Sequence, residues 1–191
     1  MRIIGGKAKG RRLFFPSVSR ERPTSDFLRE ALFNLLGSLE DKTFLDLFAG
    51  SGSVGLEAAS RGAKEVYFIE KNKNLIEIIK RNIQTCCLDI NFGIIAQDIE
   101  HGVEDLFKKK TKIDIIFADP PYNRNMVKIT RDLLNKYQIF KEDSVIVIQH
   151  STKEILIESV DNNFYYTDQR KYGDNALTFL KWRKNDAGRF H

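Results

Sequence analysis

The sequence predicts an α/β fold: a doubly wound, mostly parallel sheet of seven strands, closed by an antiparallel hairpin and preceded by a basic N-terminal arm. Three features predict it. Apolar strand-like runs alternate with segments of helical periodicity along the chain. One strand leads directly into a glycine-rich turn that opens a helix. The last two strand-like runs flank Tyr172 to Asn175, where Tyr-Gly-Asp-Asn is typical of a hairpin turn.

The composition is that of one soluble globular domain. With 191 residues, 42% apolar and 30% charged, the chain is long enough for a full core. We expect a single, monomeric domain over residues 1–191, with a loose tail over residues 185–191. No run approaches the roughly eighteen apolar residues of a membrane span, and no signal peptide is evident, so we expect a cytoplasmic protein without membrane contact. Adjacent Cys86 and Cys87 suit neither a disulfide nor a zinc site, and we expect no metal.

Positive charge is concentrated in the arm, residues 1–22. Seven cations and one acid give this segment a net charge of +6, so the remaining 169 residues sum to −1. Such a run can be plain solvated surface, but glycines among the cations suggest a turn that presents them together, and Phe14 and Phe15 can anchor the arm. We expect it to bind a phosphate backbone. The candidate cations are Arg2, Lys7, Lys9, Arg11, Arg12 and Arg22.

The first helix is predicted over residues 26–36. Hydroxyls that can cap a helix precede it, Asp26 lies in its first turn, and Gly37 ends it. Leucines recur along it at helical spacing, so the helix should pack on the sheet. The predicted buried residues are Leu28, Leu32, Leu35 and Leu36.

The glycine turn follows the first strand, predicted over residues 44–48. Gly50, Gly52 and Gly55 form a G-x-G-x-x-G pattern, and a helix over residues 54–60 comes next. A second strand, residues 65–69, ends on Glu70 at about the twenty-residue spacing that brings an acid to the two hydroxyls of a ribose. A nucleoside-containing ligand is therefore predicted, although packing alone also explains small residues at such a turn.

Asp46 indicates which nucleoside ligand binds. It lies four residues before Gly50, where a carboxylate would repel the pyrophosphate of NAD but attract the ammonium group of S-adenosyl-L-methionine. The methyl donor is therefore favoured. The alternative is that Asp46 only hydrogen-bonds its own turn.

The remaining elements continue the alternation of helices and strands. Leu75, Ile76, Ile79 and Ile83 mark the inner face of a second helix. Asp98 follows the third strand. A nearly continuous apolar run forms the fourth strand, as expected of a buried parallel strand. We predict strands over residues 92–96, 112–118, 145–149, 164–169 and 176–182, and helices over residues 103–109 and 126–137.

The fourth strand leads into Asp119, Pro120, Pro121 and Tyr122. The prolines remove two N–H donors, so this loop offers a carboxylate, the Pro120 carbonyl and an aromatic ring. Two acceptors can hold both hydrogens of a nucleobase amino group and aim its lone pair, while Tyr122 stacks on the extruded base. The alternative is a strand-terminating loop that binds no ligand.

At these residues the sequence resembles class I S-adenosylmethionine-dependent methyltransferases of Rossmann-like fold, and within them the RsmD family, which methylates N2 of guanine 966 in 16S ribosomal RNA. The shared segments are MRIIGGKAKGRRL, RPTSDFLREALFNLL, FLDLFAGSGSVGLEAASRG, FIEKN, DPPY and YGDNAL. The resemblance implies an enzyme that acts on 16S RNA, either free or in an assembling small-subunit particle. By the resemblance the methyl donor is held by Asp46, Phe48, Gly50, Gly52, Glu70, Asp98 and Ile99, the target guanine by Asp119 to Tyr122, and RNA by the arm cations and Arg22.

Some positions depart from the family pattern. Phe27 stands where a basic residue is common, which puts one RNA contact in doubt, and Gln149 with His150 replace an expected acid. Two other functions fit the motifs. An N6-adenine DNA methyltransferase also uses DPPY, but little sequence remains here for reading DNA. A non-catalytic RNA-binding protein on the same fold is disfavoured by the intact Asp46, Glu70 and Asp119.

Overall fold

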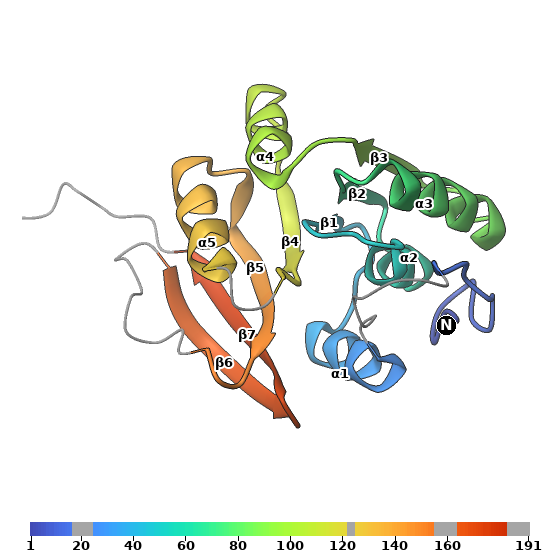
Figure 1. Cartoon of the computed structure of the whole chain (residues 1–191), viewed down its shortest axis with the longest axis horizontal. Helices are drawn as coiled ribbons and strands as arrows, with labels where there is room; N and C mark the ends of the chain where they lie inside the picture. Colours follow the sequence, from blue (N-terminus) through green and yellow to red (C-terminus); the bar gives the residue numbers. More distant parts are fainter. Residues whose placement is uncertain (17–24, 122–124, 155–163, 183–191) are drawn as a thin grey trace, which may run out of the picture.

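The computed structural model describes residues 1–16, 25–121, 125–154 and 164–182. Its centre is a seven-stranded sheet with the order β3-β2-β1-β4-β5-β7-β6 (Figure 1). Strands β1 to β5 are parallel, and β7 runs antiparallel to both β5 and β6. The strands are β1 (Thr43–Asp46), β2 (Glu65–Ile69), β3 (Asn91–Ile95), β4 (Ile113–Ala118), β5 (Phe140–Ser151), β6 (Phe164–Tyr172) and β7 (Asn175–Trp182). The predicted doubly wound fold is confirmed.

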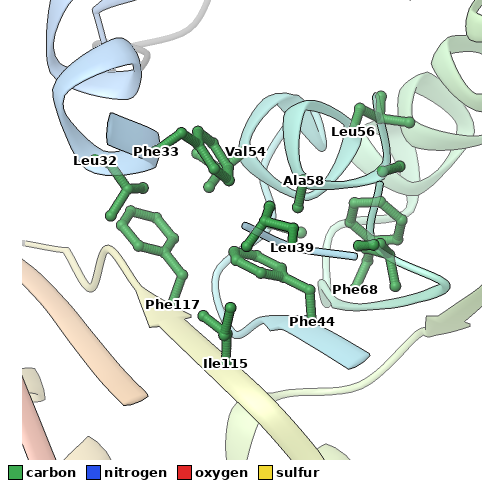
Figure 2. Close-up of a cluster of buried hydrophobic side chains, with 14 of the residues drawn as sticks. Leu32, Phe33, Leu39, Phe44, Val54, Leu56, Ala58, Phe68, Ile115 and Phe117 are labelled. Atoms are coloured by element: carbon green, nitrogen blue, oxygen red, sulfur yellow. The ribbon is translucent and has the colours of Figure 1, made fainter. Parts of the chain in front are cut away.

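Helices cover both faces of the sheet. They are α1 (Asp26–Leu36), α2 (Ser53–Ser60), α3 (Lys73–Cys86), α4 (Ile99–Lys108) and α5 (Met126–Lys136). Neighbouring strand residues point to opposite faces, so Phe44 belongs to the core under α1, α2 and α3, whereas Leu45 belongs to the core under α4 and α5. Figure 2 shows Phe44 and Phe117 of the sheet facing Leu32 of α1 and Val54 of α2.

Helix α1 has the predicted bounds but a different buried face. The Ser25 hydroxyl caps it by accepting a hydrogen bond from the Leu28 amide at 3.1 Å. Phe33 is buried, whereas Leu35 is 40% exposed. The prediction for Leu35 was wrong because the buried side of the helix extends from Leu28 through Leu32 and Arg29 to Phe33, which leaves Leu35 at the edge of that side, in the last turn.

Two other elements start several residues earlier than predicted. Helix α4 begins at Ile99 instead of residue 103, because the Asp98 carboxylate accepts a hydrogen bond from the His101 amide at 3.0 Å and caps it. Strand β5 begins at Phe140 instead of residue 145. Its first part carries three exposed charged residues, which hid the strand pattern in the sequence.

The described part of the N-terminal arm, residues 1–16, folds back on itself and packs against α2 and α3. The Ile3 amide donates to the Arg11 carbonyl at 2.9 Å, and the Leu13 amide donates to the Met1 carbonyl at 3.1 Å. Buried apolar side chains hold this loop to the body, namely Ile3, Ala8 and Leu13. Phe14 also joins the arm to α3, because Asn82 accepts from its amide at 2.7 Å and donates to its carbonyl at 3.0 Å, and the Arg81 guanidinium lies over its 38% exposed side chain.

None of the helices in the described ranges is long and apolar enough to cross a membrane. Cys86 is buried, Cys87 is exposed, and both are free thiols, as expected.

Candidate functional site

The predicted site residues gather at one edge of the sheet. Asp46, Glu70 and Asp119 end or directly follow the parallel strands β1, β2 and β4, which are neighbours in the order β2-β1-β4. Parallel strands end at the same edge. The chain also reverses its direction of winding between β1 and β4, where open α/β sheets bind ligands. The three carboxylates therefore meet at the expected binding crevice.

The glycine turn serves both backbone geometry and packing. Gly52 adopts a left-handed conformation, with φ of 78°, at the N-cap position of α2, where a glycine offers no capping side chain. A Cβ atom at Gly55 would lie 2.3 Å from the Phe68 ring, so this glycine is required for packing whatever binds. The packing explanation therefore accounts for Gly55, while Gly52 has no side chain to cap α2, and a first-turn amide, that of Gly55, donates to the Asp46 carboxylate instead.

Asp46 is a buried acid without an ion pair. Its side chain is 1% exposed, and it forms no salt bridge within the part of the chain that the structure describes. Its pKa is raised to about 7: burial is the largest cause, the carboxylates of Asp119 and Glu70 also raise it, and the amides of Gly55 and Phe48 act in the opposite direction.

A bound cation would relieve this accumulation of negative charge. Asp46 Oδ2 accepts from the Gly55 amide at 3.1 Å, so the residue does brace its own turn. The amides of Gly55 and Phe48 do not compensate for burying an acid beside two others. A methyl donor that carries an ammonium and a sulfonium group fits this environment, whereas a pyrophosphate would add repulsion.

Glu70 joins the end of β2 to the glycine turn. Its Oε2 accepts from the Gly50 amide at 2.9 Å, and its Oε1 accepts from the Asn72 amide at 2.8 Å. A carboxylate has about four acceptor positions, so both oxygens can still receive the hydroxyls of a ribose. Glu70 therefore fixes the turn and presents acceptors beside it.

Asp98 and Ile99 follow β3, next to β2 at the same edge of the sheet. One oxygen of Asp98 receives the amide of His101 and lies 2.8 Å from its ring Nδ1, and these hydrogen bonds lower the Asp98 pKa. Ile99 is partly buried against the core under α4 and α5. The pair lies where the family resemblance expects adenine.

The acceptor loop begins directly after β4. Gln149 Nε2, from the end of β5, donates to Asp119 Oδ2 at 3.0 Å. Pro120 is buried and Pro121 is exposed, whereas Tyr122 lies outside the described residues. Sequence reasoning treated Gln149 only as a departure from the family pattern. The signal that could have identified it is a polar residue that ends an otherwise apolar strand.

The arm presents its cations to solvent. Arg22 lies outside the described residues, and the other five candidates are exposed: Arg2, Lys7, Lys9, Arg11 and Arg12. Glu57 of α2, itself fully buried, accepts from the amides of Ile4 and Gly5, both at 2.8 Å, and from Arg61 Nε at 2.7 Å. Sequence reasoning missed this buried anchor, which fixes the arm to the sheet domain.

Arg2 and Arg12 also approach α1. They line a pocket together with Met1 and Asp26. In Figure 1, α1 lies between the arm and the β6–β7 hairpin. Among the described residues, no cluster of three or more metal-ligating side chains occurs.

Solved structures share this architecture. A hypothetical protein of Thermus thermophilus superposes with a TM-score of 0.81 at 31% identity, over 95% of this chain and 99% of that one. A protein solved in complex with SAH shares the fold with a TM-score of 0.66 at 18% identity, over 81% of this chain and 48% of that one. This shared architecture is the Rossmann-like fold of class I methyltransferases.

Sequence relatives place the chain more narrowly. The family model described as Conserved hypothetical protein 95 matches residues 1–181. Ribosomal RNA small subunit methyltransferase D of Buchnera aphidicola subsp. Acyrthosiphon pisum is 36% identical over 156 residues, which cover 81% of this chain and 80% of that protein. The protein of the same name from Escherichia coli K12 is 35% identical over 150 residues, with 78% and 74% covered. The chain belongs to this family, the RsmD family.

Proposed function

We propose that the protein transfers a methyl group from S-adenosyl-L-methionine to the exocyclic N2 amino group of a guanine in 16S ribosomal RNA, the one numbered 966. The observation that carries this proposal is the meeting of Asp46, Glu70 and Asp119 at one edge of the sheet, beside an arm of exposed cations. The relatives named as small subunit methyltransferases support the choice of RNA. We also propose that the enzyme works as a cytoplasmic monomer.

The donor half of the site is formed by β1, β2 and β3. S-adenosyl-L-methionine supplies a methyl group activated on a positively charged sulfur. Asp46 would hold the ammonium group, Glu70 the ribose hydroxyls, and Asp98 with Ile99 the adenine. Phe48, Gly50 and Gly52 would line the methionine part, because they form the turn between Asp46 and α2.

The acceptor half is formed by the loop after β4. Asp119 and the Pro120 carbonyl would accept the two hydrogens of the target amino group. This arrangement localises the nitrogen lone pair and points it towards the donor, and positioning of this kind can contribute up to roughly 7–11 kcal/mol to catalysis. Pro121 and Tyr122 would hold the extruded base, with the Tyr122 ring stacked on it.

RNA would be held by the arm. Arg2, Lys7, Lys9, Arg11 and Arg12 are exposed on a loop that buried side chains fix to the body, so their charges can contact phosphates with little loss of conformational freedom. Arg22 is proposed to join them. The substrate is either free 16S RNA or the assembling small-subunit particle.

Transfer of a labelled methyl group tests the proposal. Free 16S RNA, the protein-bound RNA and an adenine-containing DNA duplex are incubated with the enzyme, and the modified nucleoside is identified by mass spectrometry. We expect N2-methylguanosine in one or both RNA samples. A product of N6-methyladenine would favour the DNA methyltransferase. RNA binding without donor binding or product would favour a non-catalytic protein.

A further inference from the structure

Gln149 is a buried amide that uses only part of its hydrogen-bonding capacity. Its side chain is 4% exposed and lies at the carboxyl end of β5. Nε2 donates to Asp119 Oδ2 at 3.0 Å. Oε1 is enclosed and receives no hydrogen bond from the described residues. A buried acceptor without a donor is unfavourable in the free enzyme, and a ligand that brings a donor removes this penalty.

Asp119 fixes the orientation of this amide. The two ends of a Gln amide have nearly the same shape, and their assignment follows from the hydrogen bonds that they make. An ionised carboxylate only accepts, so the amide nitrogen must face Asp119 and the oxygen must face away. The pairing of β4 with β5 brings the two side chains together. Ala118 pairs with Ile148, so the next residues, Asp119 and Gln149, project to the same face of the sheet.

The edge of β4 and β5 therefore offers a base three acceptors. They are the Asp119 carboxylate, the Pro120 carbonyl and Gln149 Oε1, while one of the two N–H groups of the Gln149 amide is already used by Asp119. Such an edge matches a base with an exocyclic amino group and a ring N–H side by side. Guanine has this pattern at N2 and N1. Adenine and cytosine carry a ring acceptor beside their amino group, which would face Gln149 Oε1 with repulsion.

We propose that Gln149 is a specificity-determining residue, whose Oε1 accepts the N1–H of the target guanine while the neighbouring loop holds its amino group. The inference rests on the proposed function. It assigns the choice between guanine and adenine to Gln149 Oε1, whose orientation is fixed by the hydrogen bond from Gln149 Nε2 to Asp119.

A guanine analogue separates this readout from catalysis in general. 2-Aminopurine keeps the amino group at C2 but has no N1–H. A 16S RNA fragment carrying 2-aminopurine at the methylated position is compared with the guanine fragment, using kcat/KM for methyl transfer. Wild-type enzyme should prefer guanine by roughly 10- to 100-fold, the usual cost of losing one base-specific contact.

Gln149→Met removes the acceptor while keeping the length of the side chain. It should slow transfer to both RNAs, because Asp119 loses its donor, and should reduce the guanine preference at least about fivefold. Gln149→Glu keeps an acceptor oxygen and should retain the preference, although a second acid beside Asp119 should shift the acid limb of its pH–rate profile upward. Gln169→Met is the matched control, because Gln169 donates to Thr178 on the β6–β7 hairpin, and the preference should not change.

Three results would overturn the assignment: equal rates of the wild type on both RNAs, an unchanged preference in folded Gln149→Met, or loss of the preference in Gln149→Glu. Since Gln149→Glu tests the same oxygen, the inference remains testable if the methionine variant does not fold. Failure of the proposed function itself is distinguishable, because wild-type enzyme would then methylate no guanine RNA at all.

Discussion

At the scale of single residues, Asp46 should couple donor binding to pH. Its pKa is raised to about 7 in the free protein, mainly by burial, so the side chain is largely protonated below that pH. A cationic donor favours the ionised form, and binding should therefore release a proton. Donor affinity should rise by up to about tenfold per pH unit towards pH 7 and level off above it.

Calorimetry from about pH 5.5 to 8, in buffers of different ionisation enthalpy, measures both the affinity and the released proton. Asp46→Asn should bind the donor more weakly and without this pH dependence. The stability of the folded, donor-free protein should change in the opposite direction. The folded state retains a proton that the unfolded chain loses above the ordinary Asp pKa of 3.8. The contribution of Asp46 to stability therefore falls as the pH rises from about 4 to 7. A donor affinity that is flat across this range would contradict the assignment of Asp46 to the cation.

Asp119 should affect turnover far more than binding. Asp119→Ala leaves the target amino group one acceptor, and turnover should fall at least about a hundredfold, which corresponds to roughly 2.7 kcal/mol in the barrier. Asp119→Asn should retain intermediate activity, because the amide oxygen still accepts but lacks the charge that stabilises the developing cation.

Single-turnover rates of donor-saturated variants measure this step, and RNA affinity should barely change. Asp114, at the other end of the same strand, provides a matched control. It accepts from the Thr43 amide at 2.9 Å and pairs with Lys141 at 2.8 Å, so Asp114→Ala should lower stability without a comparable loss in the transfer rate. A near-normal rate for Asp119→Ala would leave Asp119 with only a bracing role.

At the scale of elements, sequence patterns predicted most of the fold but few of its long-range contacts. The bounds of α1 and the position of the glycine turn follow from local signals, namely a capping serine and glycines that allow sharp turns. Glu57 could not be predicted, because an acid in a short helix resembles a surface residue until the arm folds onto it. Gln149 was missed for a related reason: its partner Asp119 is thirty residues away in sequence.

The contact between the arm and α2 is testable at Gly6. Its φ is 73°, and a Cβ atom there would lie only 1.8 Å from the Ser60 carbonyl oxygen. Gly6→Ala should therefore displace the arm and weaken RNA binding without changing any charge. Gly10 is a matched control, because its φ of 86° imposes the same backbone strain but nothing lies within 4 Å.

Thermal unfolding and RNA titration of the two variants separate the effect of the clash with Ser60 from the effect of backbone strain alone. Gly10→Ala should cost about 1–2 kcal/mol, the usual penalty for a left-handed residue with a side chain. Gly6→Ala should cost about 1–3 kcal/mol more through overpacking. Equal effects of the two substitutions would mean that close contact with Ser60 does not position the arm.

At the scale of the whole molecule, the uneven distribution of charge should separate RNA binding from donor binding. Neutralising Lys7, Lys9, Arg11 and Arg12 removes four exposed cations from the arm. Each phosphate contact releases counterions, so the slope of log affinity against log salt should fall by about 0.7–0.9 for every cation that contacts a phosphate. Donor affinity should stay unchanged, because the proposed donor site lies at the sheet edge and consists mainly of carboxylates rather than arm cations.

A second quadruple variant supplies the control for net charge. Lys108, Lys109, Lys110 and Lys112 are also exposed, but they lie at the end of α4 and in the loop that follows it, at the amino end of β4 and therefore opposite the site. Neutralising them changes the net charge by the same amount and should leave the salt slope almost intact. If the two quadruple variants lost affinity equally, RNA would be responding to overall charge, and the arm would lose its assignment as the RNA-binding surface.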